Sequence, residues 1–328
     1  MSYPVAAAPF PAGSANHNPP LAGTFIPSIW STNLLVKFYA STVLSEIANT
    51  DYEGEIKSFG EKVTIRTRPT IEIRDYQAGQ SLQVQRPSAP TVELNIDKGK
   101  YFNTILDDVL KHQSDINLMS VWSDDASSQM KVAIDTDVLL NLKDRCDPAN
   151  RGNAAGKKTG DIRLGVTGTP VAVVARDATD GNVEIIDLIT RMGEVLDQQN
   201  IPEDGRYIVA PVWFTSMIKR SELRNAALSG DGQSMLRNGR LGEIDRFTIY
   251  SSNLMPMNVE AGLANGESII YFGHKVALTF ATQFTETETL KSESTFGWIV
   301  RGLQVYGYNV LKPEALGQAV VAKGVVTG

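Results

Sequence analysis

Apolar and polar side chains alternate along two stretches of the chain between residues 62 and 97. The apolar positions are Val63, Ile65, Ile71 and Ile73 in the first stretch and Val92, Leu94 and Ile96 in the second. A period of two is typical of a strand with one face in water. The segment between the two stretches is polar and contains Gly79, Pro87 and Pro90, which favour turns. The pattern therefore predicts a long two-stranded ribbon over about residues 52–100.

Such a ribbon has an apolar face that it cannot cover by itself. An isolated two-stranded hairpin is marginally stable in water, and its open edges invite pairing with other chains. The cover must come either from the rest of this chain or from other copies of it. The pattern alone leaves both alternatives open.

A longer apolar stripe with helical spacing follows the ribbon. No Gly or Pro occurs from Lys100 to Asp147. The apolar positions on one helical face are Met119, Trp122, Ala126, Met130, Ala133, Ile134, Val138 and Leu142. They predict the longest helix of the protein, within residues 105–150 and ended by Asp147-Pro148. A weaker stripe before the ribbon predicts a short helix within residues 31–51.

The second half of the chain mixes strand and helix patterns. The expected elements are strands at 171–174, 207–210, 246–250, 298–300 and 303–308, two strands at 268–272 and 275–280 that pair with each other, and helices at 185–196 and after Pro211. Asn182 is the expected N-cap of the first of these helices. Residues 229–242 contain four glycines and predict a loop, and the final residues 319–328 are small and apolar. Strands mixed with helices indicate an α+β or α/β domain.

The first residues of the chain carry no charge. Residues 1–23 are rich in Ala, Pro, Gly and Asn, and no charged residue precedes Lys37. An uncharged, proline-rich segment over residues 1–30 buries too little surface to offset its ordering entropy by itself. We expect either a disordered tail or an arm that becomes ordered on a neighbouring subunit.

The overall charge limits the possible partners. The 328 residues include 31 Lys and Arg against 37 Asp and Glu, which gives a net charge of −6. Proteins that wrap nucleic acid by neutralising its phosphates are basic. Tight general binding of nucleic acid is therefore disfavoured, although a surface that lies near DNA is compatible with this charge.

Cysteine usage and hydropathy indicate where the protein is made. Cys146 is the only cysteine, which excludes an intramolecular disulfide and a multi-cysteine metal site. No stretch of about 20 apolar residues predicts a membrane span. The N-terminal residues also lack the basic and apolar regions of a signal peptide. We expect a passive thiol, synthesis in a reducing cytosol and no membrane partner.

One segment has a weak likeness to a phosphate-binding loop. Residues 152–159 are Gly-Asn-Ala-Ala-Gly-Lys-Lys-Thr, with three residues between the glycines. A phosphate-binding loop needs four residues there and a single Lys before Ser or Thr. A solvated basic linker is the favoured interpretation, and a nucleotide-binding enzyme that uses this loop is a remote alternative.

Other residues capable of catalysis or metal binding are scattered. His17, His112 and His274 lack the helical i, i+4 spacing of a zinc site. The paired acids are Asp107-Asp108, Asp124-Asp125 and Asp135-x-Asp137. They lie on the expected long helix, where such neighbours point to different faces, so solvated helix faces explain them. We therefore expect no enzyme activity and assign no catalytic residue, no cofactor-binding residue and no metal ligand.

Charges of both signs are interleaved on the ribbon. The basic residues are Arg66, Arg68, Arg74 and Arg86, and the acidic ones are Glu61, Glu72, Asp75, Glu93 and Asp97. Mixed signs favour salt-bridged contacts with neighbouring subunits over a track for phosphates.

The order of these pieces resembles the HK97-type major capsid proteins of tailed bacteriophages. The similar motifs are Arg206-Tyr207-Ile208-Val209-Ala210-Pro211, the loop and strand from Gly239-Arg240-Leu241-Gly242 to Ser252-Asn253-Leu254-Met255-Pro256, the closing Lys312-Pro313-Glu314-Ala315-Leu316, and residues 24–30 and 49–56 near the start. Arg246 departs from the pattern, because many members of the family have Gly there. The resemblance covers nearly the whole chain.

The resemblance implies an α+β, HK97-like capsid fold with six parts. These are an N-terminal arm at 1–30, a short helix at 31–51, an extended β-hairpin called the E-loop at 52–104, a spine helix of the peripheral domain at 105–150, an axial domain at 151–285, and closing strands of the peripheral domain with a C-terminal tail at 286–328.

The implied function is that of a shell subunit. Copies of the chain would assemble into hexamers and pentamers of an icosahedral phage head that encloses double-stranded DNA without sequence-specific binding. The other implied partners are a portal, a separate scaffolding protein and decoration proteins. The protein would be made in the cytoplasm of a host bacterium and located in the virion capsid. An encapsulin-like shell of a cellular nanocompartment, with an enzyme as cargo, is the alternative.

Overall fold

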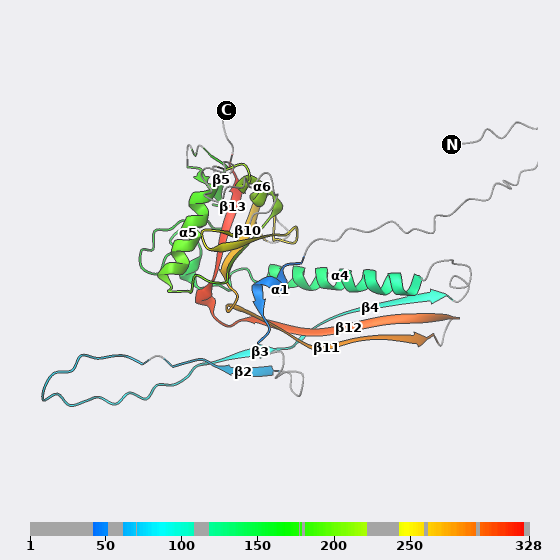
Figure 1. Ribbon diagram of the computed structural model, residues 1–328, viewed down its shortest axis with the longest axis horizontal. Helices are drawn as coiled ribbons and strands as arrows, with labels where there is room; N and C mark the ends of the chain where they lie inside the picture. The colour runs from blue at the N-terminus through cyan, green and yellow to red at the C-terminus, as the bar shows by residue number, and fades with distance from the viewer. Residues whose placement is uncertain are drawn as a thin grey trace, which may run out of the picture. The chain divides into compact units, whose positions relative to one another are not determined.

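The computed structural model describes residues 42–51, 62–69, 71–107, 118–176, 178, 181–221, 243–258, 262–292 and 296–324. All of them belong to one compact unit, residues 38–328. This unit contains two sheets with their helices, and a ribbon that packs on one of the sheets (Figure 1). Within the described ranges, no helix combines the length and the apolar character that crossing a membrane requires.

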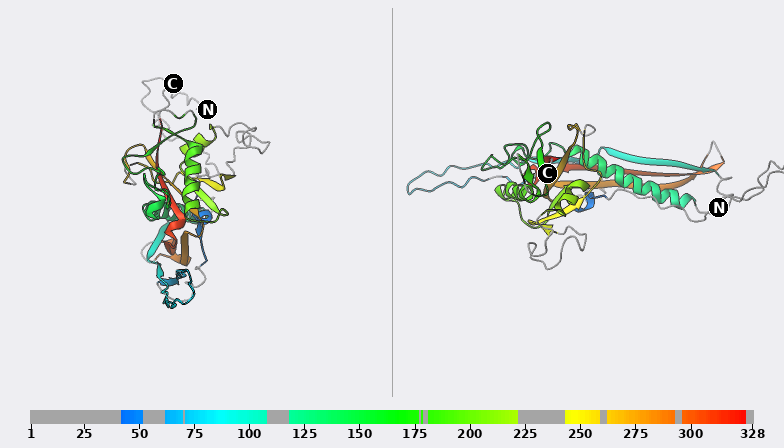
Figure 2. Two further views of the ribbon diagram at one scale, coloured as in Figure 1. Left: turned by 90° about the vertical axis from the view of Figure 1, so that its left-hand side faces the viewer. Right: turned by 90° about the horizontal axis from the view of Figure 1, so that it is seen from above.

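The first sheet has four strands in the order β1-β11-β12-β4. They are β1 (Ala48–Asn49), β11 (Leu278–Lys291), β12 (Gly297–Val310) and β4 (Lys98–Asp107). β12 pairs antiparallel with both β11 and β4. The 24-residue helix α4 (Leu118–Asn141) lies along one face of this sheet (Figures 1 and 2). The short helix α1 (Leu44–Ile47) comes directly before β1.

The second sheet has seven strands in the order β6-β5-β13-β10-β7-β9-β8. They are β6 (Val183–Glu184), β5 (Val171–Val174), β13 (Leu316–Lys323), β10 (Glu267–His274), β7 (Arg206–Ala210), β9 (Phe247–Ser251) and β8 (Glu243–Ile244). Two helices, α5 (Ile185–Gln198) and α6 (Val212–Ile218), pack with it, and two 3-10 turns, η1 (Pro148–Asn150) and η4 (Pro313–Ala315), lie in the connections.

Two apolar cores hold these layers together. One core contains Ile134, Val138 and Leu139 of α4 with residues from α1 and from both sheets. The other contains the apolar faces of α5 and α6 and strands of the seven-stranded sheet. β7 is buried throughout, and β10 is buried except at His274. Burial on both faces explains why residues 207–210 form a continuous apolar run.

The ribbon begins as a separate two-stranded sheet of β2 (Lys62–Arg66) and β3 (Thr91–Asn95). Its apolar residues pack on the four-stranded sheet in a small cluster of Val63, Ile65, Leu94, Ile96, Ala281 and Val305. The approach is close, because a Cβ atom added at Gly307 would collide with the backbone of Asn95.

Several elements expected from the sequence are confirmed. The apolar stripe after residue 118 forms α4, and residues 171–174 form β5. β7 runs into Pro211, which is the N-cap of α6. Residues 298–300 and 303–308 are parts of the single strand β12. Asn182 is not the cap of α5, because Glu184 holds that position and makes no side-chain capping bond.

The expectation that helix begins at residue 105 is wrong for residues 105–107. These residues belong to β4, and the described part of α4 begins only at Leu118. β4 forms because its backbone pairs with β12, with Ile105 opposite Ile299. The pattern expected for β2 was also too long, since the strand ends at Arg66 rather than continuing to residue 74.

The expected pairing of residues 268–272 with 275–280 is also wrong. β10 pairs with β13 and β7, whereas β11 pairs with β12 and β1. The two segments therefore lie in different sheets, and the chain passes from one sheet to the other at residues 275–277.

The C-terminal segment differs from its expected place among the closing strands of the long helix's sheet. Residues 316–323 form β13, which lies between β10 and β5 in the seven-stranded sheet. β11 begins at Leu278, before the expected boundary at residue 286. The expected arm at 1–30, helix positions 31–41 and loop at 229–242 lie outside the described residues.

Candidate assembly surfaces

The ribbon continues past β2 and β3, but its described residues between Arg66 and Thr91 form no further paired strands. Both the N–H and the hydroxyl of Thr67 donate to the carbonyl of Pro90, at 2.9 and 2.7 Å. Further out, side chains connect the two arms: the Glu72 N–H donates to Gln85 at 3.1 Å, and the Gln85 amide donates back to the Glu72 carbonyl at 2.9 Å. Arg74 donates to Gln83. These partners stand opposite each other in the register that β2 and β3 begin.

That register puts the apolar residues of the outer ribbon on one face. If Glu72, Arg74, Gln83 and Gln85 share one face, the intervening positions belong to the other. The intervening apolar residues are Ile71, Ile73, Leu82 and Val84, which are 62, 89, 77 and 90% exposed. The same face is covered at the base of the ribbon, where Val63, Ile65 and Leu94 pack on the sheet. One apolar face is thus covered at its base and open towards its tip.

Charged residues on the ribbon are only partly paired. Lys62 contacts Glu93 at 3.0 Å, and Arg74 contacts Glu72 at 2.9 Å. Arg66, Arg68 and Arg86 are exposed, and within the described ranges they form no ion pair. The Glu72–Gln85 contacts extend the register of β2 and β3, and alternation from them puts Arg86 on the open apolar face opposite Ile71 and Arg66 and Arg68 on the other face.

The four-stranded sheet has a second open surface, on the side away from α4. Lys98 of β4 and Tyr306 of β12 pair with each other and both donate to Asp137 of α4, so the alternate residues of these strands point away from the helix. The exposed apolar residues of this outer face are Tyr101, Ile105, Leu290 and Leu303. Arg301 donates to Glu288 at 2.6 and 2.9 Å in the middle of the face, and Glu286 stands exposed beside them. Val305, which packs on the base of the ribbon, lies on this same face.

A polar cluster connects α4 to the sheet. The Asp137 carboxylate accepts hydrogen bonds from Lys98 at 2.9 Å, from Tyr306 at 3.1 Å and from Tyr308 at 3.3 Å. Lys98 also lies 4.5 Å from the centre of the Tyr308 ring. Burial raises the pKa of Asp137, but the hydrogen bonds and charge of Lys98 and the tyrosines outweigh it, so the pKa is lowered. This cluster holds α4, β4 and β12 together.

Asp135 lies two residues before Asp137 on α4, on another side of the helix, and its environment is different. Its side chain is 1% exposed. Oδ2 accepts the N–H of Val43 at 2.8 Å, and Oδ1 has no hydrogen-bond partner among the described residues. Burial raises the pKa of this carboxyl, and the bond from Val43 offsets only part of the rise. The expectation that solvated helix faces explain Asp135 and Asp137 is therefore wrong, because Asp135 is buried and Asp137 is half-buried and bonded to the sheet.

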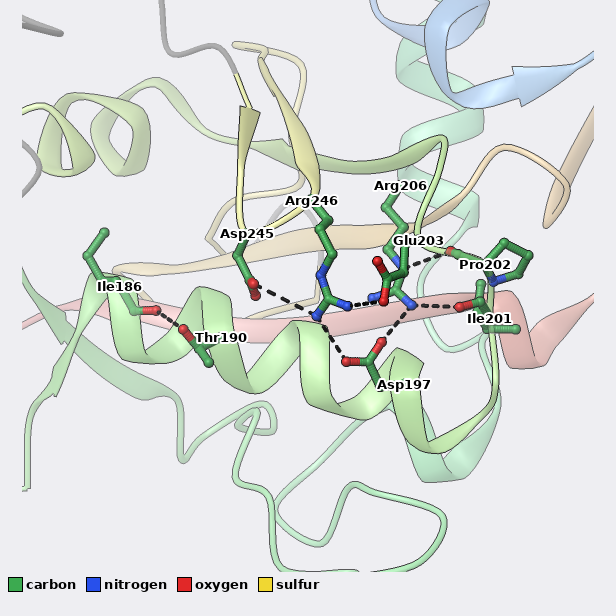
Figure 3. Close-up of polar contacts among 9 residues, drawn as sticks. All are labelled: Ile186, Thr190, Asp197, Ile201, Pro202, Glu203, Arg206, Asp245 and Arg246. Atoms are coloured by element: carbon green, nitrogen blue, oxygen red, sulfur yellow. Dashed lines mark hydrogen bonds and ion pairs between the residues drawn. The ribbon is translucent and has the colours of Figure 1, made fainter. Parts of the chain in front are cut away.

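A third cluster joins the end of α5 to the turn between β8 and β9 (Figure 3). The buried Arg206 donates to Asp197 at 2.7 Å and to the carbonyl of Ile201 at 2.6 Å. Arg246 donates to Asp197 at 3.0 Å and to Glu203 at 2.7 Å. Burial raises the pKa of Asp197, but the two arginines outweigh it and lower the pKa. The cluster is a structural tie within the seven-stranded region.

Arg246 also occupies a backbone conformation that favours glycine. Asp245 and Arg246 form the two-residue turn between β8 and β9, with φ angles of 47° and 65°. This is the position where the resembling family often has Gly. The turn is tight in spite of the arginine, and from that position the guanidinium reaches the carboxylates of Asp197, Glu203 and Asp245.

Backbone N–H groups of the loop at 152–159 donate hydrogen bonds to other residues of this chain. The N–H groups of Lys158 and Thr159 donate to the Gln198 side chain at 2.9 and 3.2 Å. The N–H of Gly156 donates to the carbonyl of Ala149 at 2.7 Å. A phosphate-binding loop needs such N–H groups to converge on a ligand. This geometry supports the linker interpretation.

The remaining candidate residues do not come together. His17, His112 and Asp108 lie outside the described residues, and the Nδ1 of His274 accepts the N–H of Val276 at 3.1 Å. Cys146 is buried, which raises the pKa of its thiol to about 12. Among the described residues, no group of three His, Cys, Asp or Glu side chains is placed to hold a metal ion.

Solved structures show which fold class this is. No protein-family model matches the chain, and no curated protein matches it in sequence. The similar solved structures are phage capsid structures, and they match along most of the chain. The chain therefore has the mixed α+β fold of phage capsid proteins.

Three of these structures illustrate the likeness. A chain of Mycobacterium phage Che8 is 24% identical with a TM-score of 0.70, over 90% of this chain and 97% of that one. The capsid structure of Cyanophage P-SCSP1u is 16% identical with a TM-score of 0.67, over 94% and 100%. The mature capsid of bacteriophage PhiM1 is 14% identical with a TM-score of 0.66, over 92% of each chain.

Proposed function

We propose that this chain is the major capsid protein of a tailed bacteriophage. Copies of it form the hexamers and pentamers of an icosahedral head around double-stranded DNA. In the terms of the HK97 fold, the ribbon is the E-loop and α4 is the spine helix. The four-stranded sheet then belongs to the peripheral domain and the seven-stranded sheet to the axial domain. The net charge of −6 suits a shell that encloses DNA without gripping it.

One observation carries this proposal: the apolar face of the ribbon is covered at its base and open towards its tip. Ile73 and Val84 stand opposite each other on that face and are 89 and 90% exposed. Exposed apolar side chains that form a contiguous row mark an interaction surface. In the proposed mechanism, the outer ribbon lies on an adjacent copy and buries this row there.

The outer face of the four-stranded sheet is the surface we propose to receive it. This face offers apolar contacts through Tyr101, Ile105 and Leu303, and it carries the exposed carboxylate of Glu286. The ribbon brings Arg86, which forms no ion pair within the described ranges, among its apolar residues. Apolar patches of similar size with opposite charges suit each other. Repetition around each capsomer turns individually modest contacts into a stable shell.

Deleting the tip of the ribbon tests the proposal. Removal of residues 77–90 should leave a soluble, folded subunit that assembles poorly, because those residues make no core contact. Size-exclusion chromatography with negative-stain electron microscopy measures the particles that the wild-type and shortened chains form. Normal particles from the shortened chain would count against the proposal, and so would a wild-type chain that stays a compact monomer.

Point substitutions on the two faces of the ribbon provide a matched comparison. Ile73→Ser combined with Val84→Ser changes only the open apolar face, while Gln83→Ser changes the opposite face next to it. The first variant should assemble poorly and the second normally. Equal assembly by both would show that the apolar face is not the contact.

The contents of the particles distinguish a phage head from a cellular compartment of the same fold. A head assembled during infection protects double-stranded DNA from nuclease. A compartment instead contains an enzyme cargo and no genome. Nuclease protection followed by mass spectrometry of the purified particles separates these outcomes.

A further inference from the structure

One edge of the four-stranded sheet is open along a long and regular strand. β4 is the last strand of this sheet, and β12 is its only strand partner among the described residues (Figure 1). The ten residues of β4 pair with β12 without a register shift. About half of the N–H and C=O groups of an antiparallel strand point to each side, so β4 presents a row of them away from β12.

The other edges of the two large sheets lack these properties. β1, β6 and β8 are edge strands of two residues each. β11 extends past β1, but its pairing with β12 shifts register between Thr282 and Phe284. The part of β11 beyond this shift contains Glu286 and Glu288. Short length, irregular register and charge keep sheet edges from pairing with other chains, so β4 is the edge that is left competent to pair.

The side chains of β4 indicate what its partner is. On the outer face of the sheet the strand presents Tyr101, Asn103 and Ile105 in turn. Tyr101 and Ile105 are 78 and 48% exposed, and Asn103 is exposed between them. This order of apolar, polar and apolar residues is symmetric about Asn103. A second β4 that runs antiparallel about a two-fold axis at Asn103 therefore puts Tyr101 opposite Ile105 twice, and pairs of an aromatic with a β-branched residue stabilise sheets.

The neighbouring strands extend this match across both copies. On the outer face, Leu303 of β12 stands beside Tyr101, and Ile299 of β12 stands beside Ile105. In the paired sheet, each apolar row of one copy continues into an apolar row of the other. The two outer rows each contain Leu303 and Tyr101 from one copy and Ile105, Ile299 and Leu290 from the other, and the row between them contains Glu288, Arg301 and Asn103 from both copies.

Other registers lose the match. A shift by two residues places Asn103 opposite Tyr101 or Ile105, so polar and apolar rows meet. A shift by one residue places outer-face residues opposite residues that face α4, which the pleat of the sheet does not allow. The register about Asn103 is therefore the one that the pattern of β4 and β12 specifies.

We propose that two copies of this chain pair through β4, antiparallel and about a two-fold axis at Asn103, so that their four-stranded sheets form one continuous sheet. The inference goes beyond the proposed function, because it needs only a second copy of the chain. An icosahedral shell also supplies two-fold axes between its subunits. The pairing uses the edge of the sheet, whereas the proposed ribbon contact uses its outer face, so the two contacts are compatible.

Cysteine cross-linking of the full chain, as free subunits and as particles, tests the position of the axis. Asn103→Cys places the new thiol opposite its own copy, with the Cβ atoms about 4.5–5.5 Å apart. Mild oxidation or a short bis-maleimide should give at least about tenfold more covalent dimer than for the wild-type chain, because the only wild-type thiol, Cys146, is buried. Tyr101→Cys and Ile105→Cys are the controls. Each new thiol would lie about 14 Å from its own copy, so neither variant should cross-link by itself.

A mixture of the two control variants tests the register. Tyr101 of one copy stands opposite Ile105 of the other, so the Tyr101→Cys and Ile105→Cys chains should cross-link to each other when mixed. An Asn103→Cys dimer without this mixed product would overturn the proposal, because the strands would meet in another register. So would cross-linking of Tyr101→Cys alone to the same extent as Asn103→Cys, which random collision would produce. Absence of the Asn103→Cys dimer from both free subunits and particles would overturn it as well.

The ribbon variant separates this inference from the proposed function. Ile73→Ser combined with Val84→Ser removes the ribbon contact and leaves β4 unchanged. The Asn103→Cys dimer should form equally well in that background, although shell assembly is impaired there. Loss of the dimer in that background would overturn an independent contact through β4. If the wild-type chain forms no shell but the Asn103→Cys dimer appears in the specified register, the proposed function fails and the pairing through β4 stands.

Discussion

At the scale of single residues, α4 holds two carboxylates in opposite ways. Asp137 accepts donors from Lys98, Tyr306 and Tyr308, so its charged form is stabilised. Asp135 accepts one N–H and is otherwise enclosed, so its charged form is disfavoured. Two residues of separation on a helix suffice for this, because they turn the side chains to different surroundings.

The stability of Asp135→Asn should depend on pH with a definite sign. Burial raises the pKa of Asp135, so the stability linked to this carboxyl is fully present below the ordinary value of about 3.9 and is lost as pH rises through the folded value. The variant has no such loss. Its stability relative to wild type should therefore increase from pH 4 to pH 8 in urea titrations. A relative decrease over that range would contradict the assigned environment.

Asp137→Asn should show the opposite dependence. Because the pKa of Asp137 is lowered, its carboxylate contributes stability above about pH 4, and this contribution is lost as pH falls through the folded pKa. The variant should be less stable than wild type by about 1–3 kcal/mol at pH 7, since hydrogen bonds to a charged group are lost. The difference should shrink on acidification, as urea titrations at pH 7 and pH 3 would measure. Asp124→Asn is the control and should change little.

The two acids also show what a sequence can and cannot predict at this scale. Helical spacing was enough to predict that Asp135 and Asp137 point to different faces. It could not predict that both faces are covered, because the covering groups are Val43, 92 residues earlier, and Tyr306, 169 residues later. The apolar neighbours Ile134 and Val138 were the available indication that this turn of the helix is enclosed.

At the scale of elements, the sequence predicted the helices better than the strand partners. α4 and α5 follow from apolar stripes that are local in the chain. β4 was partly mistaken for helix because Ile105 and Leu106 fit either period over so short a stretch. Residues 105–107 form a strand because they pair with β12. That partner lies about 200 residues further along the chain, so the local sequence does not reveal the pairing.

A glycine in β12 should control how the ribbon sits on the sheet. A Cβ at Gly307 would collide with the backbone of Asn95, so Gly307→Ala should push the base of the ribbon away. Hydrogen exchange should become faster in β2 and β3 and stay unchanged in β7 and β10. Gly99→Ala is the control, because the nearest atom to its added carbon is 4.0 Å away. Equal effects of both changes would contradict the close contact at the ribbon base.

The β8–β9 turn allows strain and ion pairing to be separated at one position. Arg246→Ala loses the contacts to Asp197 and Glu203 and keeps a residue with a Cβ at a φ of 65°. Arg246→Gly loses the same contacts but relieves the left-handed conformation. The glycine variant should therefore be more stable than the alanine variant by about 1 kcal/mol in thermal or urea unfolding. Equal stabilities would show that the turn relaxes when the guanidinium is removed.

At the scale of the whole molecule, the sequence predicted that the ribbon needs a partner, but it did not predict which part of the ribbon this chain covers and which part is left for another copy. Alternation alone indicated a ribbon with an apolar face that required cover, from this chain or from other copies. The structure shows that this chain covers the inner part of the face, at Val63 and Leu94, and leaves Ile73 and Val84 open. Register across the ribbon, which the sequence could not fix, also separates Arg86 from Arg66 and Arg68.

That separation allows a charge-reversal test of the proposed contact between copies. Arg86 lies on the open apolar face, and Glu286 is exposed on the receiving face. Arg86→Glu and Glu286→Arg should each raise the subunit concentration needed for assembly by about tenfold, because each places like charges together. The double variant should recover most of the loss, since the pair is restored with its signs exchanged.

Arg68→Glu is the matched control for this test, because it makes the same change on the opposite face of the same ribbon. It should assemble like wild type, and combining it with Glu286→Arg should give no recovery. Light scattering against subunit concentration measures all five variants. Recovery by Arg68→Glu would mean that the reversal acts through overall charge. Failure of the Arg86 and Glu286 pair to recover, with each single variant impaired, would mean that the ribbon meets its neighbour in another register.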